Sequence, residues 1–278
     1  MAVARNLAKA WLLLVGFCVG LAAVGWALGD YRLASIFLFC GLLTAGGLAF
    51  YADRVVLGMV GAAELPYAAA PIVHSTVERL SLLAGVPKPR LYVLPDAYPR
   101  ALAAGRGARG ASIAVSPGLV GLLAPAELEG VLAHEVAKIA NRDVTVQTPL
   151  VVMAAMVVET SRIGGWLERA LLFVLGPIAA SFLHLLLTSK REFAADRVAA
   201  GLCGSPHGVA DALIRLEQTE ELFEFKSSPA TEPLYTVNPF LEEGLAALFV
   251  THPPMGERVR RLRDLDPAWR EKLKIEAA

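Results

Sequence analysis

Residues 134–138 read H-E-V-A-K, and they suggest the most specific chemistry in the chain. In an H-E-x-x-H helix the two histidines are four residues apart, so they share one face and can bind the same zinc ion. The glutamate between them acts as general base on metal-bound water. Here His134 and Glu135 are present, but Lys138 stands where the second histidine is expected. The sequence therefore predicts a hydrolytic metal site that lacks one ligand.

Two carboxylates further along the chain strengthen this interpretation. Glu192 and Asp196 are four residues apart on a predicted helix, within the sequence R-E-F-A-A-D. A carboxylate on a second helix is a common third zinc ligand, and a nearby acid often orients a ligand histidine. We expect Glu192 to bind the ion together with His134, and Asp196 to lie behind them.

Lys138 determines how such a site would behave. A protonated amine has no lone pair to donate, and lysine amines are normally protonated at neutral pH. Zinc affinity should therefore be reduced. The same ammonium would suit a metal-free site among Glu135, Glu192 and Asp196, because it supplies positive charge there. Alternatively, Lys138 extends along the helix surface into solvent.

Three other histidines, His74, His207 and His252, could in principle replace the missing ligand. We interpret His252 as a helix-start or substrate-side residue. His74 and His207 are more simply explained as ordinary polar residues.

The elements that must position these residues begin with a membrane hairpin. Residues 11–28 and 34–51 are apolar runs, each long enough to cross about 30 Å of hydrocarbon as a helix. A short polar turn, residues 29–32, separates them. The first run lacks an A-x-A cleavage site, which favours an uncleaved anchor over a signal peptide.

Two further apolar runs, residues 144–158 and 170–187, come later in the chain. We expect this pair to enter the membrane, although Pro149 interrupts the first run. The alternative is a helical hairpin buried within a soluble core.

The rest of the chain predicts a mainly α fold with a small β-sheet. Helices are expected at residues 71–84, from Pro125, from Pro206 to about Leu222, and from Thr251. Strands are expected at residues 90–94 and 112–116, with a loop or weak strand at 101–110 and a loop at 226–244.

Overall composition agrees with a membrane protein. Of the 278 residues 55% are hydrophobic and 19% are charged, the formal net charge is zero, and the mean hydropathy is +0.52. This balance gives no reason to expect a nucleic-acid partner. The three cysteines form no CxxC pair or even disulfide framework, which suits a protein facing the cytosol.

The stretches at residues 134–143, 191–196 and 251–254, in this order, resemble the M48 family of membrane zinc metallopeptidases, in its HtpX-like branch. The resemblance implies an α+β, zincin-like metallopeptidase domain with transmembrane helices. It implies zinc held by His134, Glu192 and the residue at position 138. Glu135 would be the base and Asp196 a supporting acid. His252 and Arg258 would lie on the substrate side.

The resemblance also implies an organisation along the chain: a transmembrane hairpin at 1–54, the first part of the peptidase domain at 55–143, a second apolar pair at 144–188, and the second part of the domain at 189–278. The partners would be the lipid bilayer and polypeptide substrates. The location would be the cytoplasmic membrane, crossed more than once. Substrate would add as a strand beside residues 112–116.

The chain departs from the family pattern beside that strand. Arg100 and Leu102 stand where asparagine and phenylalanine are usual. An alternative function, favoured by Lys138, is an inactive relative that binds membrane-protein clients. A structural membrane protein with coincidental motifs is disfavoured by the ordered match of three motifs.

The charges flanking the hairpin predict its orientation. Arg5 and Lys9 precede the first run and Arg54 follows the second, so both outer ends should face the cytoplasm. A reporter enzyme inserted at Asp30 should then be active only on the opposite side of the membrane. A cytoplasmic signal from Asp30 would contradict this topology.

Overall fold

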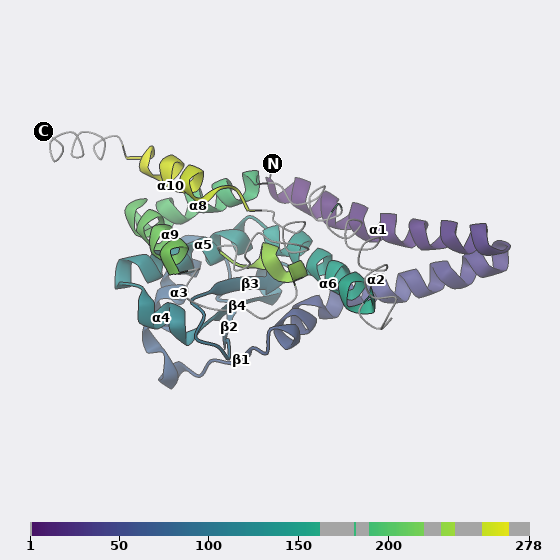
Figure 1. Ribbon diagram of the computed structural model, residues 1–278, viewed down its shortest axis with the longest axis horizontal. Coiled ribbons are helices and arrows are strands. Elements are labelled where there is room, and N and C mark those ends of the chain that lie inside the picture. Colours follow the sequence, from purple (N-terminus) through teal and green to yellow (C-terminus); the bar gives the residue numbers. More distant parts are fainter. Residues whose placement is uncertain (1, 162–180, 182–188, 220–228, 237–251, 267–278) are drawn as a thin grey trace, which may run out of the picture.

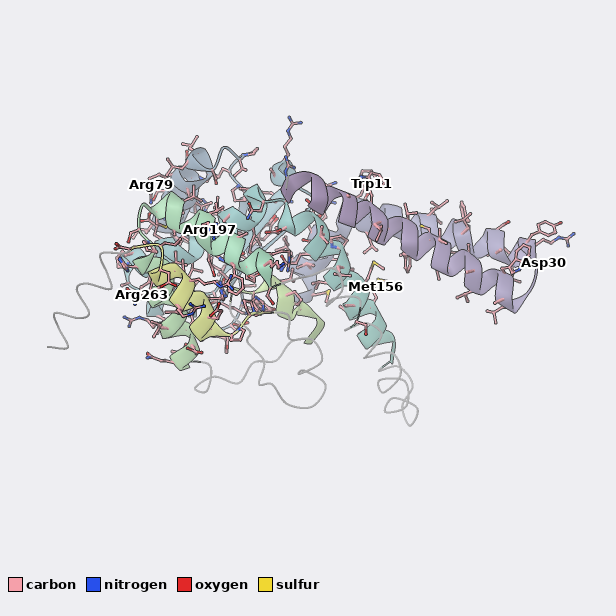
Figure 2. All side chains as sticks on the ribbon, turned by 90° about the horizontal axis from the view of Figure 1, so that it is seen from above. Trp11, Asp30, Arg79, Met156, Arg197 and Arg263 are labelled. Atoms are coloured by element: carbon pink, nitrogen blue, oxygen red, sulfur yellow. The ribbon has the colours of Figure 1, made fainter. Side chains whose placement is uncertain are left out.

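Helices α1 (Ala2–Leu28) and α2 (Tyr31–Met59) form the predicted hairpin in the computed structural model, which describes residues 2–161, 181, 189–219, 229–236 and 252–266. Asp30 caps α2, because its carboxylate accepts the backbone N–H groups of Arg32 at 2.9 Å and Leu33 at 3.3 Å. Figure 2 shows Asp30 at the far tip of the hairpin, which projects from the rest of the molecule.

The hairpin exposes large apolar side chains along its length, among them Trp11, Trp26, Phe39 and Phe50. Helix α2 is long and apolar enough to cross a membrane, and Leu14–Leu28 within α1 is a shorter apolar stretch. Side chains of this kind are stabilised by lipid rather than by water.

The small sheet has four strands, β1 (Ala63–Glu64), β2 (Arg90–Val93), β3 (Ala101–Gly105) and β4 (Ala111–Val115), in the order β1-β2-β4-β3. Strands β2 and β4 are parallel, and the other two pairings are antiparallel. Both predicted strands are confirmed within one residue at each end. The uncertain region 101–110 divides into β3 and a short 3₁₀ turn at Ala108–Gly110.

The strand order overturns one expectation. Strand β4, which contains most of residues 112–116, pairs with β2 on one side and with β3 on the other. Both of its edges are therefore occupied, and no substrate strand can add beside it. The outer strand on this side of the sheet is β3.

The motif lies on helix α5 (Pro125–Ala140), which begins at the predicted proline. Glu127 at the third helical position accepts the Ala124 N–H at 2.8 Å, which satisfies a donor at the helix start. The sheet covers one side of α5, and helices α8 (Lys190–Cys203) and α9 (His207–Thr219) cover the other (Figure 1). From residue 130 to residue 139 the helix is consequently buried on all faces, including the face with the motif.

The remaining described elements surround this core. They are 3₁₀ helices η1 (Tyr67–Ala69) and η5 (Pro229–Leu234), and helices α3 (Pro71–Leu83), α4 (Pro117–Leu122), α6 (Asp143–Ser161) and α10 (Met255–Arg263). Gly85 has a φ of +66° and ends α3, as predicted.

Helix α6 contains the first of the later apolar runs and continues past Pro149. It packs against α2 and η5, and most of its side chains up to Ala155 are buried in protein. The second run, residues 170–187, lies outside the described residues except for Ser181. The predicted helix from Pro206 is confirmed as far as Thr219, the last of the described residues in this part of the chain.

The contact between α5 and α9 leaves no room for a side chain. A Cβ built on Gly130 would lie 2.7 Å from the Val209 backbone nitrogen. Gly130→Ala should therefore push α9 away and lower the free energy of unfolding by about 1–3 kcal/mol. Gly121→Ala is the matched control, because nothing lies within 4 Å of its Cβ position. Thermal unfolding of the full chain in detergent measures both, and equal melting temperatures would contradict this packing.

Candidate metal centre

His134 lies between two carboxylates supplied by helix α8. Its Nε2 is 3.2 Å from Glu192 Oε2, and its Nδ1 is 2.8 Å from Asp196 Oδ1. All three side chains are buried. The structure thus brings together three residues selected from sequence on two separate helices, and their roles at a metal remain predictions.

Arg258 of helix α10 binds the far side of Asp196. Its Nε and Nη2 donate to the two carboxylate oxygens at 2.9 and 2.8 Å, in a bidentate pair that is fully buried. Burial alone would raise the pKa of Asp196, but Arg258 and His134 outweigh it and lower the pKa to about 2. The pKa of Arg258 is raised in turn, because attraction to Asp196 exceeds the effect of burial.

Burial and neighbouring charges also shift the pKa values of His134 and Glu192 in opposite directions. Burial lowers the pKa of His134, but contacts with Asp196 and Glu192 raise it further, so the net shift is upward. Burial raises the pKa of Glu192, yet His134, His252 and Lys138 bring it well below its usual range. Glu192 and Asp196 are therefore both ionised at neutral pH.

Lys138 is buried, with only 1% of its surface exposed. Its Nζ donates to the Leu234 carbonyl oxygen at 2.8 Å and lies 3.4 Å from Glu135 Oε2. The alternative that this side chain extends into solvent is wrong. Glu135 Oε1 accepts the Thr236 hydroxyl at 2.7 Å, whereas the buried Oε2 makes no hydrogen bond of normal geometry.

His252 approaches the centre but directs Nε2 elsewhere. This nitrogen is 2.9 Å from the Tyr235 carbonyl oxygen and 3.9 Å from Glu192 Oε2. A carbonyl oxygen can only accept, so Nε2 donates and has no lone pair for a metal in this arrangement. His74 and His207 contact Leu65 and Asp266, which supports ordinary polar roles for both.

Two atoms at the centre suit a metal ion. His134 Nε2 and Glu192 Oε2 are buried, and neither makes a hydrogen bond of normal geometry despite their close approach. Two ligands of a tetrahedral zinc ion, each at about 2.0–2.1 Å from it, would be about 3.3 Å apart. This pair therefore has the spacing of two zinc ligands.

The third ligand position does not suit zinc. Lys138 stands at the ligand's place in the sequence and directs its Nζ to the Leu234 carbonyl oxygen, and the described residues contain no group of three His, Cys, Asp or Glu side chains arranged to hold a metal. The residues present thus do not fit a complete three-ligand zinc site.

Several contacts of the centre were missed from sequence. The segment 234–236 was expected to be part of a loop, and its residues contact Lys138, His252, Glu135 and Arg258. Arg258 was predicted on the substrate side, but no sequence pattern indicated its pairing with Asp196. Arg100, noted only as a departure, donates to the Tyr235 hydroxyl at 2.7 Å and also pairs with Asp96.

Comparison with known proteins gives consistent matches. The model of Peptidase family M48 matches residues 68–266. A Protease HtpX homolog of Pelotomaculum thermopropionicum is 35% identical over 275 residues, covering 92% of this chain and 98% of the relative. A Protease HtpX homolog of Pyrococcus furiosus is 34% identical over 271 residues, covering 91% and 94%.

Among solved structures, the crystal structure of S. mikatae Ste24p is similar to this chain with a TM-score of 0.50 and 18% identity. The similarity covers 94% of this chain and 66% of Ste24p, just under two thirds of that chain. It supports a shared fold.

The buried ion pair predicts a large difference between two arginines of α10. Arg258→Met leaves Asp196 charged and buried without its partner, which should cost about 3–5 kcal/mol of unfolding free energy. Arg260→Met is the matched control, because Arg260 is exposed and pairs with Glu257 at the surface, where little change is expected. Melting temperatures of the two variants in detergent check this. Similar small losses in both would contradict a dominant role for the Arg258–Asp196 pair.

Proposed function

Because this chain belongs to peptidase family M48, a family of metallopeptidases, we propose that it is an HtpX-like membrane-bound zinc metalloendopeptidase whose activity is impaired by Lys138. The observation that carries the proposal is the buried pair His134 Nε2 and Glu192 Oε2, at 3.2 Å, with the buried Glu135 following His134 in the motif helix. Its substrates would be unfolded or membrane polypeptides.

Each residue of the centre has a role in this proposal. His134 and Glu192 would bind the metal when it is present, and Glu135 would act as the general base. Asp196, fixed by Arg258, holds the His134 ring in place through Nδ1. His252 and Arg258 contact the main chain of segment 235–236, so they would hold polypeptide near the centre.

The proposed setting is the cytoplasmic membrane, with the peptidase domain facing the cytoplasm. The hairpin α1–α2 anchors the chain, and residues 144–188 would cross the membrane as well. A zincin-like domain would be formed by residues 55–143 and 189–278, since α5 from the first part packs against α8 and α9 from the second.

A second candidate function is a protein that binds polypeptide clients without hydrolysing them. The specific observation in its favour is the ammonium of Lys138, which is buried and hydrogen-bonded at the position of the third ligand. With this ammonium in place the centre has positive charge without a metal.

Replacing Lys138 should restore metal binding. Lys138→His supplies a neutral nitrogen on the same helix face and removes a repulsive charge, so the zinc content of purified protein should rise from well below one equivalent to about one. Lys88→His is the control, because Lys88 pairs with Glu78 at the surface. Proteolysis of a fluorogenic polypeptide should appear together with the zinc.

Glu135→Gln in the Lys138→His background separates binding from hydrolysis. Zinc should stay bound while proteolysis disappears, because the base is not a ligand. Full zinc content and rapid cleavage in the unaltered chain would contradict impairment by Lys138. Restored zinc without cleavage would favour the client-binding function.

A further inference from the structure

The sheet has two outer strands, the two-residue β1 and β3. Strand β3 packs against the motif helix α5, so an extended polypeptide would add along the edge of β3 that is not paired with β4. In the structure this edge is already covered. Leu102 forms an antiparallel bridge with Tyr235, and the Gly105 N–H donates to the Thr148 hydroxyl of α6 at 2.9 Å. All five residues of β3 are buried, and helices α5 and α6 pack against the strand.

The segment that covers the edge, Leu234–Thr236, is held through its own main chain. Three consecutive carbonyl oxygens each accept a hydrogen bond from a different side chain. Lys138 donates to the oxygen of Leu234 at 2.8 Å, His252 to that of Tyr235 at 2.9 Å, and Arg258 to that of Thr236 at 2.6 Å. Recognition through main-chain carbonyls is independent of side-chain identity, as binding of varied polypeptides requires.

Side chains of the same segment engage the chemistry of the site. The Thr236 hydroxyl donates to Glu135 Oε1 at 2.7 Å, and the Tyr235 hydroxyl accepts from Arg100. Segment 234–236 thus hydrogen-bonds the proposed general base Glu135 and pairs with the edge of β3. It also uses the three side-chain donors that could bind the carbonyl oxygens of a polypeptide.

We propose that segment 234–236 is an internal ligand of the peptide-binding edge of β3, and that an extended polypeptide binds there by displacing it. In this proposal Lys138 replaces a metal ligand and also holds segment 234–236 in place through the Leu234 carbonyl oxygen. The inference rests on the proposed function, since it names the place where polypeptide binds. A displacing polypeptide would take over the carbonyl contacts of this segment and replace its one bridge to β3 by the several ladder hydrogen bonds of a longer strand.

A reversible covalent lock tests the proposal. The variant Leu102→Cys/Tyr235→Cys, made in a background where Cys18, Cys40 and Cys203 are replaced by alanine, joins the segment to β3 when oxidised. Antiparallel partners have Cα atoms about 4.5–5.5 Å apart, which is within disulfide range. The probe is fluorescein-labelled β-casein, an unfolded polypeptide, and its anisotropy reports binding to the full chain in detergent.

The reduced variant should bind casein, and oxidation should weaken binding at least ten-fold. The cysteine-free parent is the control and should bind equally under both conditions. Equal binding by the oxidised and reduced variant would overturn the displacement while leaving the proposed function intact. Absence of binding by the variant and by the parent would overturn both the displacement and the binding of polypeptide.

Hydrogen–deuterium exchange on the unaltered chain provides a second test that needs no variant to fold. Saturating casein should increase exchange of the amides at residues 234–236 and keep those of β3 protected. Unchanged protection of 234–236 in the presence of bound casein would overturn the proposal.

Discussion

The buried charges around His134 form the interaction on which the rest of the site depends. Arg258, Asp196, His134 and Glu192 follow one another in contact, and each charge lies beside one of opposite sign or beside the imidazole. Removing a single charge from water costs several kcal/mol, so such an arrangement is stable only when complete. This requirement fixes the positions of α5, α8 and α10 relative to one another, although the three helices come from distant parts of the sequence.

The positive charge of Lys138 compensates part of the negative charge of the buried carboxylates. A metalloprotease site normally brings two positive charges to its carboxylates through the metal. Here the ammonium brings one, and it lies next to Glu135 while binding a carbonyl of segment 234–236. The substitution therefore does more than delete a ligand, since it provides a metal-free way to satisfy buried acidic groups and attaches another part of the chain to the motif helix.

Much of the framework could be predicted from sequence because it depends on local patterns. The apolar runs predicted the hairpin, and Pro125 predicted the start of α5. The spacing of Glu192 and Asp196 predicted that both face His134 from one side of α8. The strand order could not be predicted, because pairing depends on long-range contacts that short strands do not specify. The predicted substrate strand was consequently placed beside β4, both edges of which are paired in the structure.

The surroundings of Lys138 were also beyond prediction. A lysine on a helix normally reaches solvent, and only the layers on both sides of α5 prevent this here. The contacts of segment 234–236 had no sequence signal, because three of them use main-chain oxygens, which every residue type provides.

The covered edge of β3 has a consequence beyond the chemistry of the site. An open strand edge exposes unpaired N–H and C=O groups that can join the sheet of a second molecule and start aggregation. Membrane anchoring concentrates copies of a chain in two dimensions, where such encounters are frequent. Because Tyr235 and Thr148 already occupy part of the β3 edge, this strand offers fewer unpaired groups to the sheet of a neighbouring copy.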